Sequence, residues 1–226
     1  MLKYILIIIL FHVPLYAHSI IGEVSQTSHK IIITNNEYKN KDYTRNNKYI
    51  YPGDNILCAK GSCTKILLYD GTGIEIKGMA SFTINSIRIK EQDLPASIKA
   101  QYGTFIISQN SSFLDTSLIF ETPSAIIKTV NASIFILAGT EETGTMVYKN
   151  KAGIASSAPF IKKAVILKEG EESFIKNESP PSYPKKVPLL LRGSWLSKNQ
   201  LSQKGEQIVK QNQDNSIIDW IFRNRN

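Results

Sequence analysis

Residues 49–84 read YIYPGDNILCAKGSCTKILLYDGTGIEIKGMASFTI, and this stretch decides the fold class. Its apolar residues alternate with polar ones over short runs such as KILLY, GIEIK and SFTIN, and glycines separate the runs. Such alternation, with many β-branched and aromatic residues, is typical of half-buried strands. Asp70 and Gly71 lie between the first two runs and predict a type I′ hairpin turn there.

The same pattern extends in both directions from this stretch, over residues 19–175. It recurs in GEVSQ, KIIITN, SIKAQYG, TFIISQ, TSLIFET, AIIKTV, SIFILAG, GTMVYKN, AGIASS, KAVILKEG and EESFIK. Turn-forming residues separate these runs and leave no room for helical crossovers, which favours a sandwich, a barrel or a solenoid of short antiparallel strands. The sequence therefore predicts an all-β fold and disfavours a helical α/β enzyme.

The composition is that of an ordinary globular protein. Of 226 residues, 42% are hydrophobic and 20% are charged, which is too apolar for a disordered chain. The formal net charge of +8 favours contact with anionic surfaces such as phospholipid headgroups or cell-wall polymers, but the basic residues are scattered. Two of the three histidines stand within residues 1–18, so a metal centre built from histidines is nearly excluded.

Residues 1–19, MLKYILIIILFHVPLYAHS, have the layout of a secretory signal peptide. Lys3 precedes an apolar run, Pro14 follows it, and Ala17 and Ser19 are small residues of the kind that signal peptidase accepts. The run is about ten residues long, whereas a membrane-spanning helix needs about 20. We therefore expect the mature chain to be exported to the periplasm or envelope without a transmembrane segment, and export argues against nucleic acid as a partner.

Four segments are expected along the chain. The signal peptide, residues 1–19, precedes a β domain over residues 20–176, in which the polar residues 39–48 predict a long surface loop. Residues 177–188 hold four prolines and predict an extended linker or a strap along a sheet edge. Residues 189–226 form a C-terminal tail whose apolar residues recur at loosely helical spacing, so a partly helical tail is expected.

Cys58 and Cys63 are the two cysteines of the chain. Residues 56–58 and 64–68 read as the arms of a hairpin, which would place the two thiols face to face across a loop of residues 59–62. An even, closely spaced pair in an exported protein is normally a disulfide. A redox-active pair would need the spacing Cys-x-x-Cys, and zinc would need two more ligands. We therefore expect a structural disulfide.

No pattern in the sequence predicts catalysis. The chain has no Gly-x-Ser-x-Gly elbow, and YDGTGIEIKG lacks the lysine and the following helix of a phosphate-binding loop. Ser62 and Ser173 each precede a lysine by three residues, but a predicted turn and a predicted strand hold them instead of a helix start. The sequence therefore predicts a protein that is not an enzyme and that uses no cofactor and no metal.

Tyrosines near the polar loop are the first candidate binding residues. Tyr43, Tyr49 and Tyr51 surround this loop and could form an aromatic wall for a sugar or a peptide. The alternative is that they are half-buried residues of the sheet, which is the more common role of tyrosine in such folds.

An apolar cluster in the tail is the second candidate. It consists of Ile217, Trp220, Ile221 and Phe222, and such a cluster costs free energy when it is left in water. We expect it either to contact a partner protein or to dock on the domain of its own chain.

The order of these strands and turns resembles the FecR domain. IIGEVSQ and YIYPGDNILCAKGSCTKILLYDGTGIEIKG are similar to that family's Gly-x-Val start, its Gly-Asp-x-Ile step and its Asp-Gly turn between apolar strands. The resemblance continues through SIKAQYGTFIIS, SLIFETPSAIIKTVNASIFIL and TMVYKNKAGIASSAPFIKKAVILKEGEESFI, and so covers residues 20–174. One departure is Asn131-Ala132-Ser133, which stands where the family usually has Gly-Thr before a phenylalanine.

The resemblance implies an exported all-β domain built from repeated small sheets. In regulatory members this domain lies in the periplasm, passes on a signal from an outer-membrane receptor, and is joined through a transmembrane helix to a cytoplasmic segment that controls a sigma factor. A signal peptide stands where those parts would be, so we expect a free-standing exported member without the anti-sigma segment. Its expected function is to bind another envelope protein, and the alternative ligand is cell-wall glycan, either peptidoglycan or polysaccharide.

Overall fold

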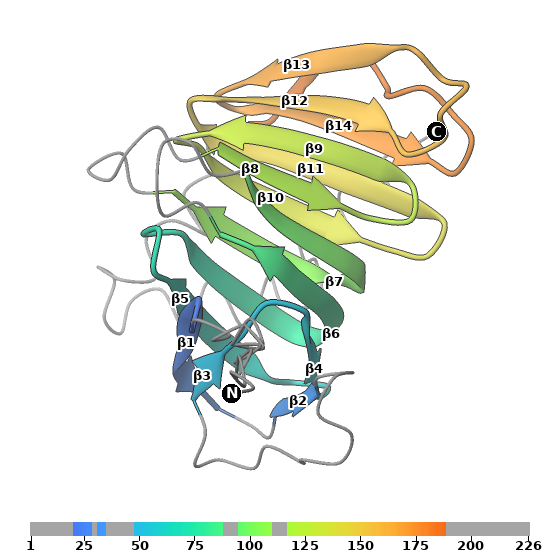
Figure 1. The fold of residues 1–226 in the computed structure, drawn as a ribbon. Helices are drawn as coiled ribbons and strands as arrows, with labels where there is room; N and C mark the ends of the chain where they lie inside the picture. The colour runs from blue at the N-terminus through green and yellow to red at the C-terminus, as the bar shows by residue number, and fades with distance from the viewer. Residues whose placement is uncertain (1–19, 29–30, 35–47, 88–94, 110–116, 189–226) are drawn as a thin grey trace, which may run out of the picture.

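The computed structural model describes residues 20–28, 31–34, 48–87, 95–109 and 117–188. Every regular element in these ranges is a β-strand, which confirms the all-β prediction (Figure 1). The strands are β1 (Gly22–Thr27), β2 (Ile31–Thr34), β3 (Tyr49–Ile50), β4 (Asp54–Cys58), β5 (Cys63–Leu68), β6 (Gly73–Ser86), β7 (Ala96–Ser108), β8 (Ser117–Glu121), β9 (Ala125–Val130), β10 (Ser133–Ala138), β11 (Glu142–Lys149), β12 (Lys151–Ser156), β13 (Ala164–Lys168), β14 (Glu171–Lys176) and β15 (Lys185–Lys186). The described ranges contain no helix that is long and apolar enough to cross a membrane.

Two pairs of predicted strands are fused into long, bent strands. The runs GIEIKG and SFTINSI form β6, and the runs SIKAQYG and TFIISQ form β7. Gly78, with φ +76°, lies inside β6, and Gly103, with φ +141°, lies inside β7. Positive φ inside a strand breaks the regular pleat, and the register between β6 and β7 shifts between Lys77 and Ser81. The two glycines therefore bend strands that continue past them.

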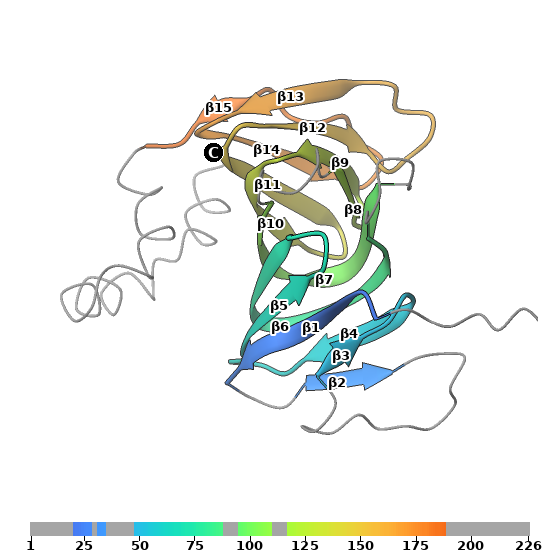
Figure 2. The same cartoon turned by 60° about the vertical axis from the view of Figure 1, so that its left-hand side comes forward.

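These bends allow β6 and β7 to belong to two layers at once. β5 pairs with the first half of β6, and β4 pairs with its second half. β7 is divided in the same way, because its first half pairs with β8 in parallel and its second half pairs with β10 antiparallel. One layer therefore runs β2-β4-β6-β7-β8-β9-β12-β13, and the second layer runs β3-β1-β5-β6-β7-β10-β11-β14-β15 (Figures 1 and 2).

The hydrophobic core fills the space between the two layers. It is continuous from Ile21 at one end to Ile175 at the other and consists largely of isoleucine. Phe105 lies near its centre and makes edge-to-face contacts with Phe82 and Phe120, at ring-centroid distances of 5.3 and 5.1 Å. All three rings are fully buried, so aromatic packing joins β6, β7 and β8.

The predicted hairpin and disulfide at the cysteines are wrong. β4 and β5 each pair with β6 rather than with each other, and residues 59–62 turn the corner between them. The Gly78 amide donates to the Ser62 carbonyl at 2.7 Å, and the Ser62 hydroxyl donates to the Gly78 carbonyl at 3.0 Å. Cys58 therefore points into the core whereas Cys63 is exposed, and both thiols are free.

The turn predicted at Asp70 and Gly71 is present, but it is not of type I′. The Gly71 amide donates to the Leu68 carbonyl at 3.0 Å, and the Leu68 amide donates to the Thr72 carbonyl at 2.9 Å. A type I′ turn needs positive φ at two consecutive residues, and within residues 68–72 only Gly71 has it, at +85°. This pattern is that of a three-residue hairpin loop that ends in a bulge at glycine.

The proline-rich segment lies along the edge of β14. The Ser182 amide donates to the Phe174 carbonyl at 2.9 Å, β15 pairs with the start of β14, and the Val187 amide donates to the Gly170 carbonyl at 2.8 Å. These bonds hold the segment against the sheet over its length. The expected signal peptide, the tail of residues 189–226 and residues 39–47 of the predicted loop lie outside the described residues.

Candidate functional site

The outer face of the second layer carries exposed apolar side chains at its β3-β1-β5 end. β1 lies between the other two strands, and the register places Glu23 beside Tyr49 on β3 and beside Leu67 on β5. Alternate residues of a strand point to opposite faces. Because Ile50 and Leu68 are buried in the core, Glu23, Tyr49 and Leu67 point away from it.

Three of these side chains form what we call the β1-face cluster: Tyr49, Leu67 and Tyr69. They are 40%, 46% and 49% exposed, respectively. Tyr69 continues β5 along this face, because its amide donates to the Ile21 carbonyl at 3.0 Å. Single exposed apolar residues are common on proteins, but these three large side chains lie on one face, on either side of β1, and large apolar side chains gathered on one face mark surfaces that bind a partner.

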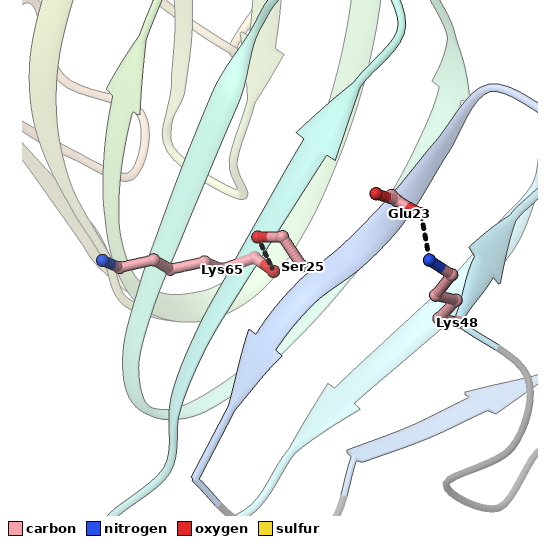
Figure 3. Close-up of polar contacts among 4 residues, drawn as sticks. All are labelled: Glu23, Ser25, Lys48 and Lys65. Atoms are coloured by element: carbon pink, nitrogen blue, oxygen red, sulfur yellow. Dashed lines mark hydrogen bonds and ion pairs between the residues drawn. The ribbon is translucent and has the colours of Figure 1, made fainter.

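An ion pair lies beside the β1-face cluster, and Figure 3 shows its two side chains, Glu23 and Lys48. The Lys48 Nζ atom lies 2.8 Å from Glu23 Oε2 and 5.7 Å from the centroid of the Tyr49 ring. The hydrogen bond to Glu23 raises the pKa of Lys48. This ion pair is exposed, so it contributes little to folding stability. The Ser25 hydroxyl donates to the Lys65 carbonyl at 3.2 Å, at a bulge in β1 (Figure 3).

Gly22 allows β1 to approach β5 closely enough to build this surface. A Cβ atom at Gly22 would lie 2.7 Å from the Leu67 carbonyl oxygen and 2.8 Å from Leu68 Cδ2. Real Cβ atoms essentially never come this close to backbone atoms, so only glycine fits at this crossing. The glycine in IIGEV thus positions both Glu23 and its neighbour Leu67 on the outer face.

The structure describes two of the three tyrosines that the sequence proposed as a ligand wall. Tyr49 lies in the β1-face cluster. Tyr51 is half-buried and begins a tight turn, in which the Asp54 amide donates to the Tyr51 carbonyl at 3.1 Å and Gly53 has φ +81°. Tyr43 lies outside the described residues, as do the tail residues Ile217, Trp220, Ile221 and Phe222.

Leu67 and Tyr69 are the members of the surface that the sequence reasoning missed. Their signal was present in KILLYD, because Ile66 and Leu68 take the buried positions of the alternation and leave Leu67 and Tyr69 on the side where polar residues are expected. Within the described ranges, no group of three or more His, Cys, Asp or Glu side chains could hold a metal ion.

Two solved structures have a fold similar to that of this chain. Both are crystal structures of a "putative anti-sigma factor" from Parabacteroides distasonis, with TM-scores of 0.52 and 0.51 and sequence identities of 14% and 15%. Each match covers 64% of this chain and 64% or 65% of the other, which is less than two thirds of its length. At this identity the likeness shows the fold alone. No family model and no curated protein matches the sequence.

Proposed function

We propose that this chain is a free-standing, exported FecR-domain protein that is not an enzyme and that binds another protein of the cell envelope. Three observations support the proposal. The order of FecR-like motifs extends over residues 20–174, the fold is similar to that of solved structures described as anti-sigma factors, and residues 1–19 read as a signal peptide. The β1-face cluster is the proposed binding surface.

The observation that carries this proposal is the exposure of Tyr49, Leu67 and Tyr69 on one face, on either side of β1. Burying apolar surface stabilises a complex by about 25 cal/mol per Å², and tyrosine is among the residues that contribute most at interfaces. Lys48 and Glu23, which lie beside these side chains, would fix the orientation of the partner through charge complementarity.

Crosslinking of the mature chain in the envelope of its own cell, read by mass spectrometry, tests the proposal. The test variant carries Leu67→Ser and Tyr69→Ser. The control is Ile166→Ser, because Ile166 is 63% exposed on β13, at the opposite end of the molecule. We expect one stoichiometric protein partner with the wild type and the control, and at least about tenfold less of it with the test variant, as for loss of hot-spot residues. Equal recovery by both variants would contradict the proposal.

Cell-wall glycan is the second candidate ligand, and the Tyr49 ring with Lys48 beside it favours this candidate. Aromatic rings present an apolar face against which a sugar can pack, and a nearby ammonium group can donate to hydroxyl or acidic groups of a glycan. Retention on purified cell wall, measured in parallel, distinguishes the two ligands. If glycan is the ligand, Tyr49→Ala together with Tyr43→Ala abolishes retention and no protein is crosslinked; if a protein is the ligand, the wall retains neither form.

A further inference from the structure

The outer face of the second layer carries charged side chains at β5 and β6 and apolar side chains from β7 to β11. One cross-strand row on this face runs from charged to apolar residues and ends in a carboxylate: Lys65, Glu75, Ile106, Phe135, Met146 and Glu172. The apolar part belongs to a second hydrophobic cluster, separate from the core, which we call the outer cluster. Its buried members are Phe135, Met146, Tyr148 and Val187, and Ile106, Leu137 and Phe174 pack against them.

The outer cluster is buried although it lies on a face that points away from the core. Phe135 and Met146 are 0% exposed and Tyr148 is 5% exposed, whereas Leu67, on the same face near β1, is 46% exposed. Val187 is the one member of the outer cluster that does not come from β7, β10, β11 or β14. One aromatic side chain alone buries about 150–250 Å², so a single valine cannot cover the whole outer cluster. The cover must therefore continue beyond Val187.

The cover must also supply hydrogen-bond donors. Glu172 is 3% exposed and lies between Met146 on β11 and Lys185 on β15. Its Oε2 atom and the hydroxyl of Tyr148 are buried without a hydrogen-bond partner among the described residues. Buried polar atoms are almost always hydrogen-bonded, and a buried carboxylate is costly without a donor. Burial accordingly raises the pKa of Glu172, although Lys185 lowers it in part.

The segment that follows Val187 in the chain has the composition and the reach of such a cover. Residues 189–196 read LLLRGSWL, with four leucines, one tryptophan and one arginine. Eight extended residues span about 26 Å, at about 3.3 Å each. The sheet from β15 to β7 has four strand spacings, or about 19 Å. The segment can therefore cross the whole outer cluster without a further element.

We propose that residues 189–196 fold back over β15, β14, β11 and β10 and cover the outer cluster, with the leucines and Trp195 over Phe135 and Met146. Figure 2 shows β10, β11, β14 and β15 side by side on this layer. The docked segment completes a second, smaller core outside the sandwich. This inference does not depend on the proposed function, which rests on the β1 end of the face.

Peroxide oxidation of methionine tests the docking, because the chain contains a reference residue. Met79 is 57% exposed and Met146 is 0% exposed, so mass spectrometry of the mature chain can compare their rates. The mature chain is compared with a chain that ends at Pro188 and with a control that ends at Leu196. We expect Met146 to oxidise at least about tenfold more slowly than Met79 in the mature chain and the control, and at a similar rate in the chain ending at Pro188. Continued protection of Met146 in the chain ending at Pro188 would overturn the proposal.

Two further measurements separate uncovering from unfolding and from dimer formation. The Cys58 thiol, which is buried in the main core, must stay unreactive in each chain that is compared. If the chain ending at Pro188 does not fold, Leu190→Ser with Leu191→Ser in the full mature chain replaces it, and Leu201→Ser is its control. Protection of Met146 that disappears on dilution of the full chain from dimer to monomer would show that a second copy covers the cluster, and would overturn docking within one chain.

Discussion

Cys58 and Cys63 differ in reactivity because they point to opposite faces of the sheet. Cys58 is 1% exposed, and burial raises the pKa of its thiol, so little reactive thiolate forms near neutral pH. Cys63 is exposed, and its Sγ atom lies 4.0 Å from Glu75 Oε1. We predict that one thiol of the native protein reacts with a chromogenic disulfide reagent, and that the second reacts only after denaturation.

Single substitutions assign the two thiols in this experiment. Cys63→Ser should remove the fast reaction and leave the melting temperature unchanged. Cys58→Ser places a hydroxyl in the core and should lower the free energy of unfolding by about 1–3 kcal/mol. If neither thiol of the denatured, unreduced protein reacts, the cysteines form a disulfide and their placement on opposite faces is wrong.

Glu172 makes the stability of the folded chain depend on pH. Its pKa is raised by burial, so the folded state binds a proton at a pH where the unfolded chain, with a pKa of about 4.3, does not. Stability should therefore increase as the pH falls from neutral through the folded pKa, and should level off near the unfolded pKa. Thermal melts between pH 7 and pH 5 should show this increase in the wild type.

Glu172→Gln isolates this effect, because it keeps the shape of the side chain and removes its charge. The variant should be more stable than the wild type at pH 7, and the difference should shrink as the pH falls. Glu169→Gln, in the exposed turn before Gly170, is the control and should follow the wild type. A wild-type melting temperature that falls in parallel with that of Glu172→Gln from pH 7 to pH 5 would exclude a raised pKa.

At the scale of elements, the sequence predicted where strands occur but not where they end. The alternation in GIEIKG and SFTINSI is local, and it is correct on both sides of Gly78. Whether a glycine ends a strand or bends it depends on the neighbouring strands. At Gly78 the strand bends because of Ser62, which lies at the corner between β4 and β5. The Ser62 carbonyl accepts a hydrogen bond from the Gly78 amide, and the Ser62 hydroxyl donates one to the Gly78 carbonyl.

The same limit explains the binding surface and the cysteines. Tyr49 was found because tyrosines are conspicuous near a polar loop, but Leu67 joins it through a register with β1 from a distant part of the chain. Similarly, Cys58 and Cys63 are close in sequence, yet non-local pairing of both strands with β6 sends them to opposite faces. Local patterns fix the periodicity, and long-range register decides which side chains meet.

Gly103 is the bend of β7, and its substitution tests this account of the long strands. A Cβ atom at Gly103 would lie 2.6 Å from the Ala80 Cβ atom and 2.9 Å from Phe105 Cζ, and its φ of +141° strains any other residue. Overpacking and backbone strain each cost about 1–3 kcal/mol, so Gly103→Ala should lower the melting temperature by roughly 5–15 °C. Gly73→Ala is the control, because its Cβ would meet no atom closer than 3.8 Å. Equal melting temperatures for the two variants would contradict the bend.

At the scale of the molecule, β6 and β7 make the two layers inseparable. Each strand contributes one half to each layer, and the core between the layers is continuous. Neither layer can detach without breaking the hydrogen bonds of β6 and β7, and both ends of the sandwich share the core between the layers. We therefore expect the residues from β1 to β14 to unfold as one unit.

Phe105 tests this cooperativity because it lies at the centre of the shared core. Phe105→Leu shortens a fully buried side chain that packs on Phe82 and Phe120, and should cost about 1–2 kcal/mol. In a single cooperative unit, the protection of amide protons against hydrogen exchange falls by the same factor in β4 and in β11, which lie on opposite sides of β7. Phe160→Leu, at a position that is 64% exposed, should change neither strand. Loss of protection on only one side of β7 would mean that the sandwich consists of two units that unfold separately.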